Sequence, residues 1–272
     1  MKIEREHIEV GSATIYYQVA GAGEPVVLVH GLSGSTKWWA KNIEALARHF
    51  RVHLIDLIGF GGSQGRSRFV LSEAAGVLAE WMDQIGIEPA NVVGHSMGGY
   101  ISAELAADFP GRVDRLVLVD AAGLPFGYNY PKHAFGLLRV LRHLPFDFWP
   151  VLVQDAYRAG PVTILDALRQ ILFSDLRVKL AQIEVPALVV WGEHDTVIPV
   201  AVGETLSHSL PHAEFIVLDG AGHNPMWDRP LAFNRALLHF LTEGRQDGDA
   251  TADLSQHPQR APHAGAPTPS QA

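Results

Sequence analysis

The chain contains no cysteine among its 272 residues. That absence excludes disulfide bridges, a cysteine nucleophile and metal sites built from thiolates. The chain also has no apolar run approaching the ~20 residues that a membrane-spanning helix needs. The first ten residues alternate charged and apolar side chains and lack the apolar core of a secretory signal peptide. We therefore expect a soluble cytoplasmic protein that does not bind membranes.

Charge is also scarce. Charged residues make up only 18% of the chain, and acidic residues outnumber basic ones, for a formal net charge of −8. No basic stripe is interleaved with aromatic residues, so the composition argues against nucleic acid as a partner. Hydrophobic residues account for 47%, which is typical of a folded globular protein. The length allows one large domain with a substantial core, or two small ones.

Short apolar runs recur along the chain and indicate buried strands. Two alternating segments near the N-terminus flank Gly11-Ser12 and predict a β-hairpin. Helical patterns separate most of the later runs, which favours parallel strands joined by helices. The sequence therefore predicts an α/β fold with a doubly wound, mostly parallel, eight-stranded sheet. Its strands are expected at residues 3–10, 14–19, 26–29, 52–57, 91–93, 113–119, 187–191 and 214–218.

Helices are expected at residues 38–50, 72–85 with Ser72 at the N-cap, 99–108, 200–209 and 230–242. The alternation of strands and helices stops after Asp120. Residues 123–181 carry only helical patterns, at 133–144, 148–157 and 162–173, and predict a helical cap inserted into a core of residues 1–122 and 182–243. Residues 244–272 have no aromatic side chain and too few apolar ones to offset the entropy of ordering. They are expected to form a disordered tail.

The pentapeptide Gly94-His95-Ser96-Met97-Gly98 is the strongest chemical signal in the chain. An apolar strand at 91–93 precedes it, and an alanine-rich helical pattern follows it. A serine on a tight turn between strand and helix sits in a strained backbone region. Its neighbours two positions away must lack Cβ atoms so that strand and helix can approach each other. In this context the motif predicts Ser96 as a nucleophile.

A serine nucleophile needs a base, and the base needs a carboxylate that orients it. Such groups gather where the parallel strands of a sheet end. Asp195 and His223 each directly follow a predicted strand. Asp120 also ends a buried strand and competes for the role of the acid. The context Gly192-Glu193-His194-Asp195 favours Asp195.

These motifs resemble those of the α/β-hydrolase superfamily over residues 15–241, in particular its serine carboxylesterase and C–C hydrolase branches. The matching stretches are Val29-His30-Gly31-Leu32, Asp56-Leu57-Ile58-Gly59-Phe60-Gly61-Gly62-Ser63, the pentapeptide, Trp191-Gly192-Glu193-His194-Asp195 and Gly222-His223. The chain order Ser96, Asp195, His223 is that of the family's triad. The resemblance implies that Ser96 attacks a carbonyl, that His223 relays the proton, and that Asp195 holds the imidazole tautomer. Ile58 stands where the family usually has proline, which affects loop rigidity more than chemistry.

The tetrahedral intermediate of acyl transfer carries an oxyanion, which two preorganised donors stabilise. The backbone N–H directly after the nucleophile supplies one, which here is that of Met97. The resemblance implies that the backbone N–H of Leu32 supplies the other. We expect no cofactor and no metal, because the histidines lack metal-ligand spacing. Gly59-Phe60-Gly61-Gly62-Ser63 lacks the lysine of a phosphate-binding loop.

The predicted cap is strongly apolar, which favours a small, uncharged, apolar substrate. The leading hypothesis is hydrolysis of an ester of an apolar carboxylic acid through an acyl-enzyme, by a monomer or homodimer. A second hypothesis is hydrolysis of a carbon–carbon bond. Asp228, Phe233, Asn234 and Arg235 resemble the meta-cleavage-product hydrolases, although His95 stands where those enzymes usually have asparagine. A third hypothesis is a ligand receptor on the same fold.

Overall fold

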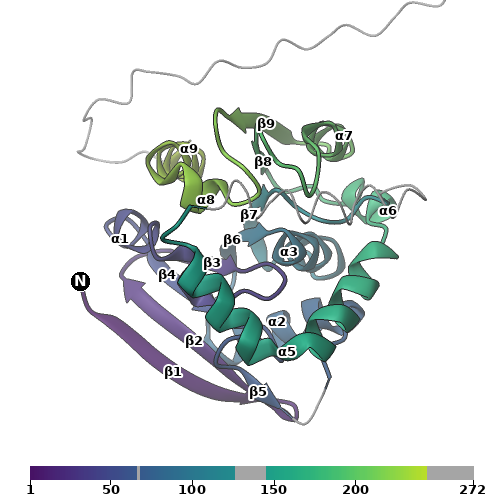
Figure 1. The fold of residues 1–272 in the computed structure, drawn as a ribbon. Helices are drawn as coiled ribbons and strands as arrows, with labels where there is room; N and C mark the ends of the chain where they lie inside the picture. The colour runs from purple at the N-terminus through teal and green to yellow at the C-terminus, as the bar shows by residue number, and fades with distance from the viewer. Residues whose placement is uncertain (66–67, 126–144, 244–272) are drawn as a thin grey trace, which may run out of the picture.

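The computed structural model describes residues 1–65, 68–125 and 145–243. The helix expected at 133–144 and the tail expected at 244–272 lie outside these residues. Within the described ranges, no helix combines the length and the apolar character needed to cross a bilayer. Figure 1 shows that the described chain is built around one twisted sheet with helices on both of its faces.

The strands of this sheet lie in the order β1-β2-β4-β3-β6-β7-β8-β9. They are β1 (Ile3–Val10), β2 (Ala13–Gly21), β3 (Pro25–Val29), β4 (Arg51–Ile55), β6 (Ala90–His95), β7 (Val113–Val119), β8 (Ala187–Gly192) and β9 (Ala213–Leu218). β1 and β2 form the predicted hairpin, β2 pairs antiparallel with β4, and the pairs from β4 to β9 are parallel. The eight-stranded, mostly parallel sheet is therefore confirmed. A two-residue strand, β5 (Gln64–Gly65), also pairs with β2.

Each face of the sheet has its own layer of helices. The longer helices around it are α2 (Leu71–Ile85), α3 (Met97–Asp108), α7 (Val200–His208) and α9 (Pro230–Thr242), and α1 (Ile43–Leu46) and α8 (Pro225–Asp228) are single turns. Val27 and Val29 of β3 pack with α2 and α3, whereas Val26 and Leu28 pack with α1 and α9. Successive residues of a strand point to opposite faces, so both faces are buried. This explains why the strands are continuous apolar runs, and it confirms the doubly wound arrangement.

One helix prediction is wrong. Residues 38–50 do not form a continuous helix but a 3₁₀ turn, η1 (Thr36–Trp39), followed by the short α1. Asn42 lies between the two and donates from its side-chain amide to Met226 O at 3.0 Å and to Asn234 Oδ1 at 2.7 Å. These bonds to distant segments fix the chain at a point where helical periodicity alone favours continuation.

The predicted start of α2 is also wrong. Ser72 is not the N-cap, because the helix begins at Leu71. Its N-cap residue is Val70, whose side chain makes no capping hydrogen bond. Gln170 closes it instead, since its Oε1 accepts Leu71 N–H at 2.8 Å. The free backbone N–H groups at the start of a helix can donate to an acceptor from a distant segment as well as to a local N-cap side chain.

The segment between β7 and β8 contains α5 (Trp149–Leu172) and α6 (Arg177–Leu180). Gly160, at a φ of +74°, interrupts the helical geometry just before Pro161. The helices predicted at 148–157 and 162–173 therefore form one bent helix, which Figure 1 shows as a V. The assignment of residues 123–181 to a separate cap stays a prediction.

Buried histidines, among them His53 and His30, contribute to the acid sensitivity of the fold. Among the described residues, His53 on β4 has no hydrogen-bond partner at either ring nitrogen, and burial lowers its pKa to about 4. Burial also lowers the pKa of His30 to about 4. Between pH of about 4 and 6.5 the folded protein therefore binds fewer protons at these rings than the unfolded chain does, so its stability rises with pH. Four carboxyl groups oppose this trend: burial raises the pKa of Asp56 to about 6, and it also raises the pKa values of Asp120, Asp155 and Asp228.

We expect the melting temperature of His53→Leu, relative to that of the wild type, to increase as the pH falls from about 6.5 to about 4. The substitution removes one titrating ring and leaves an apolar side chain beside the Trp81 ring, which His53 contacts edge-on. Thermal unfolding across this pH window tests the prediction. His7→Leu, at an exposed position of β1, is the matched control. A His53→Leu protein as acid-sensitive as the wild type would contradict the assignment.

Candidate active site

Ser96 lies on a sharp turn between β6 and α3. Its backbone φ is +52°, a region that few non-glycine residues adopt. Backbone hydrogen bonds hold the turn: Ser96 N–H donates to Val119 O at 2.9 Å, and Ser96 O accepts Ala122 N–H at 3.0 Å. The half-buried serine therefore stands at the carboxyl end of a central strand, in the strand–turn–helix context predicted for it.

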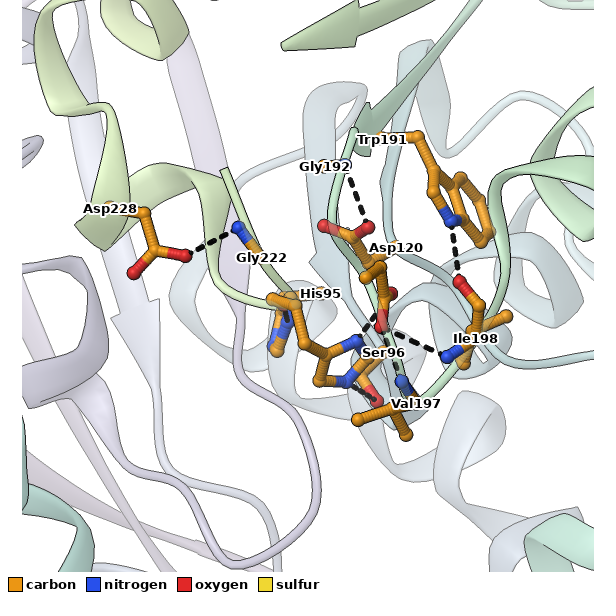
Figure 2. A network of polar contacts seen from close by, with 11 residues as sticks. His95, Ser96, Asp120, Trp191, Gly192, Val197, Ile198, Gly222 and Asp228 are labelled. Carbon is orange, nitrogen blue, oxygen red and sulfur yellow. Dashed lines mark hydrogen bonds and ion pairs between the residues drawn. The ribbon is translucent and has the colours of Figure 1, made fainter. Parts of the chain in front are cut away.

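His223 and Asp195 reach the same place from two neighbouring strands. Asp195 follows β8, and the loop after β9 carries His223. His223 Nε2 lies 3.2 Å from Ser96 Oγ, and His223 Nδ1 lies 2.7 Å from Asp195 Oδ2. Figure 2 shows the network of polar contacts around Ser96. The structure thus brings the three predicted residues together in the order serine, imidazole, carboxylate.

Asp195 is well supplied with hydrogen-bond donors. Its Oδ1 accepts Val197 N–H at 2.7 Å and Ile198 N–H at 2.9 Å, and its Oδ2 accepts from His223. Three donors compensate the loss of water around this buried carboxylate. Because Asp195 accepts at Oδ2, Nδ1 of His223 carries the ring proton. Nε2 is then free to accept the proton of the Ser96 hydroxyl.

Two further histidines hold the loops around these residues. His95 Nε2 lies 2.7 Å from the backbone oxygen of His223 and donates its proton to it. Burial lowers the pKa of His95 well below its usual value, and the nearby His223 adds to the effect. His30 Nε2 accepts Leu57 N–H at 3.0 Å, so that nitrogen is unprotonated. Both rings are neutral and serve to fix the backbone.

The two predicted oxyanion donors lie in segments that enclose Ser96. Met97 follows the serine directly and is the first residue of α3, whose free N–H groups give that end a positive electrostatic character. Leu32 follows Gly31, and an ideal Cβ placed on Gly31 would lie 3.0 Å from Ser96 Cβ. The loop after β3 therefore runs against the serine. The role of these two N–H groups as donors stays a prediction.

Asp120, the competing acid, ends β7 close to these residues. Its Oδ1 accepts Gly192 N–H at 2.9 Å (Figure 2), and its Oδ2 has no donor in the described part of the chain. Of the two candidate acids, Asp195 is the one bonded to the imidazole. The sequence did not indicate how close the rival lies. Asp120, Asp195 and His223 each offer one polar atom within 4.8 Å of the other two.

That spacing is also compatible with a metal ion. However, Asp195 and His223 meet at 2.7 Å, the length of a charge-assisted hydrogen bond. Both oxygens of Asp195 already accept N–H donors, which a metal would displace. The residues present therefore fit a hydrogen-bonded triad better than a metal site. The expectation that no metal is needed stays a prediction.

Two carboxylates hold nearby loops, and sequence reasoning gave neither this role. Asp228 Oδ2 accepts Gly222 N–H at 2.8 Å, directly before His223 (Figure 2). Asp155 of α5 is fully buried and accepts Ser35 Oγ–H at 2.6 Å. An acidic residue inside an apolar helical pattern is the only signal in the sequence, and it does not identify a distant partner.

Asp155→Ala is expected to lower the free energy of unfolding by about 2–4 kcal/mol. The substitution leaves the Ser35 hydroxyl and the Trp38 indole N–H, which donates to the same carboxylate at 3.2 Å, buried without an acceptor. Because Ser35 follows Leu32 by three residues, turnover is expected to fall as well. Denaturant unfolding and steady-state kinetics measure both effects. Asp166→Ala on the same helix is the control, and equal loss in both variants would contradict a specific anchor.

The chain is similar to several known proteins. The family model described as alpha/beta hydrolase fold matches residues 24–181 and 155–230. A protein named carbamate hydrolase RutD from Azorhizobium caulinodans is 32% identical over 257 residues, which cover 86% of this chain and 97% of the relative. The 2-hydroxy-6-oxononadienedioate/2-hydroxy-6-oxononatrienedioate hydrolase from Paraburkholderia phymatum is 34% identical over 262 residues, covering 84% of this chain and 90% of the relative.

A solved structure is similar as well. The enol-lactonase from Burkholderia xenovorans LB400 matches with a TM-score of 0.74 at 28% identity. The match covers 88% of this chain and all of that one (100%). The three similar proteins are named for different reactions, so similarity alone does not select a substrate.

Proposed function

The chain belongs to the α/β-hydrolase family, and on that premise we propose that it hydrolyses an ester of a small apolar carboxylic acid. The observation that carries the proposal is the continuous contact from Ser96 Oγ through His223 to Asp195, at 3.2 and 2.7 Å. A hydroxyl, an imidazole and a carboxylate in this order form the apparatus of acyl transfer to serine.

In the proposed reaction Ser96 Oγ attacks the ester carbonyl carbon while His223 Nε2 takes the hydroxyl proton. The backbone N–H groups of Leu32 and Met97 stabilise the oxyanion that forms. The imidazolium, stabilised by Asp195, then returns the proton to the leaving alcohol and leaves an acyl-enzyme. Water attacks the acyl group by the same route, which releases the acid and restores the serine. No cofactor, metal or partner chain takes part.

Two observations support an ester as the substrate. The enol-lactonase, which matches this chain over 88% of its length, is named for a cyclic ester. In the described part of the inserted segment, α5 and the residue before it contribute apolar side chains such as Phe148, Leu152 and Ile164 to the hydrophobic clusters. We infer that an acyl group bound against this segment is uncharged rather than charged.

A series of p-nitrophenyl esters of increasing acyl length tests the proposal and measures the pocket. We expect turnover that rises and then falls with chain length, and stoichiometric inactivation by a phosphonate that reacts with activated serines. The absence of both across the series, in folded protein, would refute ester hydrolysis.

Hydrolysis of a carbon–carbon bond is the second candidate function. It is favoured by the 34% identity to the dienedioate hydrolase over most of both chains. Both reactions use the same serine and histidine and differ in the leaving group. Product analysis with a 2-hydroxy-6-oxo-dienoate separates them, since only a C–C hydrolase releases a hydroxydienoate from it. Thermal stabilisation by such ligands without any turnover would instead favour a receptor.

A further inference from the structure

Asp120 and Asp195 form a buried pair of carboxylates at the ends of adjacent parallel strands. β7 and β8 are in register at Val119 and Val190, and Asp120 N–H donates to Val190 O at 3.0 Å. Asp120 is fully buried and Asp195 nearly so. The backbone of Asp120 is held at a φ of +42°, an unusual conformation for a non-glycine residue. The fold thus imposes this pairing.

The two carboxylates are unequally supplied with donors. Asp195 accepts three N–H groups, from Val197, Ile198 and His223. Asp120 accepts one, from Gly192, and its Oδ2 is buried without a donor in the described chain. A buried ionised oxygen without a donor is costly, whereas a protonated oxygen at that position is itself a donor.

The charges around Asp120 lead to the same conclusion. Burial raises the pKa of Asp120 well above its usual value, and the negative charges of Asp195 and Asp228 raise it further. Among the described residues, His223 is the one basic side chain that contacts the pair, with its Nδ1 2.7 Å from Asp195 Oδ2. No lysine or arginine of the described chain forms an ion pair with either carboxylate. Two adjacent buried carboxylates cannot both ionise at low cost, so one proton stays on the pair.

We propose that Asp120 is a positioning residue that holds this proton and donates it in a hydrogen bond to the Asp195 carboxylate. The proposal rests on the serine-hydrolase function given above. The pair then carries a single negative charge, which Asp195 presents to His223. When that charge is removed, the proton leaves Asp120, which becomes the anion within 4.8 Å of the imidazole. Asp120 is thus a latent acid for the triad.

A double-mutant cycle on ester turnover tests whether Asp120 is a latent acid. Asp120→Asn keeps a donor toward Asp195, so kcat/KM is expected to stay within about threefold of the wild type. Asp195→Asn is expected to cost about 10²–10³-fold. Adding Asp120→Asn to that background is expected to cost at least about tenfold more, toward the ~10⁴-fold loss of a triad without an acid. A purely structural Asp120 would cost the same factor in both backgrounds.

The pH profile of kcat/KM gives a second readout. If Asp120 were an anion in the wild type, Asp120→Asn would remove a negative charge near His223. The acid limb of the profile would then move to lower pH. We expect no such shift. A shift, or a double variant as active as Asp195→Asn, would overturn the proposal. Asp114→Asn, at an exposed position of β7, is the matched control.

Difference infrared spectroscopy separates failure of this proposal from failure of the proposed function. At neutral pH, the wild-type protein is expected to show the carbonyl band of a protonated carboxylic acid. The band should be lost in Asp120→Asn and kept in Asp114→Asn. This measurement needs no substrate. A band without turnover would refute ester hydrolysis alone, whereas turnover without a band would refute the protonated Asp120.

Discussion

Ser96→Ala is expected to reduce kcat/KM for the best ester substrate by about 10⁶-fold. The substitution removes Oγ, the atom that lies 3.2 Å from His223 Nε2, and with it the group that forms the acyl-enzyme. Remaining turnover would reflect water attacking a carbonyl that the oxyanion donors still polarise. The fold is expected to persist, because backbone groups of residue 96 hold the turn through Val119 and Ala122.

Steady-state kinetics with the ester series, together with mass spectrometry after phosphonate treatment, measure this effect. The wild type should gain one phosphonyl group on Ser96, and the variant none. Ser209→Ala is the control, because that hydroxyl donates to Thr205 O at the end of α7 and should be irrelevant to turnover. If Ser96→Ala kept wild-type rates or still formed the adduct, another residue would have to be the nucleophile.

The parts of the fold that were predicted correctly are those encoded by local pattern. Strands buried on both faces must be continuous apolar runs, so the runs at 26–29 and 113–119 identify β3 and β7 directly. The sharp turn at Ser96 needs glycines two residues before and two residues after the serine, and this spacing can be read from the sequence. That Asp195 and His223 lie beside Ser96 was predictable because the carboxyl ends of parallel strands converge. Each of these inferences depends on a few neighbouring residues.

The parts that were missed depend on contacts between distant segments. The break at Asn42 follows from side-chain bonds to α8 and α9, and the start of α2 is closed by Gln170 of α5. No local pattern encodes either partner. The distance between Asp120 and Asp195 belongs to the same class. Sequence reasoning treated them as rivals for one role, whereas the pairing of β7 with β8 makes them neighbours.

The second large effect is expected from a substitution at Gly98, two residues after Ser96. An ideal Cβ on Gly98 would lie 2.5 Å from both His30 O and Val29 O. Val29 cannot retreat easily, because β3 is paired on one side with β4 and on the other with β6, and His30 follows Val29 directly. The added methyl group must therefore push α3 away from the sheet. That movement would carry Ser96 and the start of α3 away from the loop that contains Leu32.

Gly98→Ala is therefore expected to cost at least about 3 kcal/mol of folding stability, which lowers the melting temperature by roughly 6–12 °C. Turnover should fall in the protein that remains folded, since the nucleophile and the oxyanion loop no longer face each other correctly. Gly76→Ala is the matched control inside α2, where the nearest atom to the new Cβ is Phe109 Cζ at 3.9 Å. This variant should be about 0.5–1 kcal/mol more stable than the wild type, because alanine favours the helix. Thermal unfolding of the two variants separates the steric clash at position 98 from the general effect of replacing glycine with alanine in a helix. Equal melting temperatures would show that α3 moves away from β3 at little cost. The turn at Ser96 would then be less rigid than the close approach of Gly98 to Val29 and His30 implies.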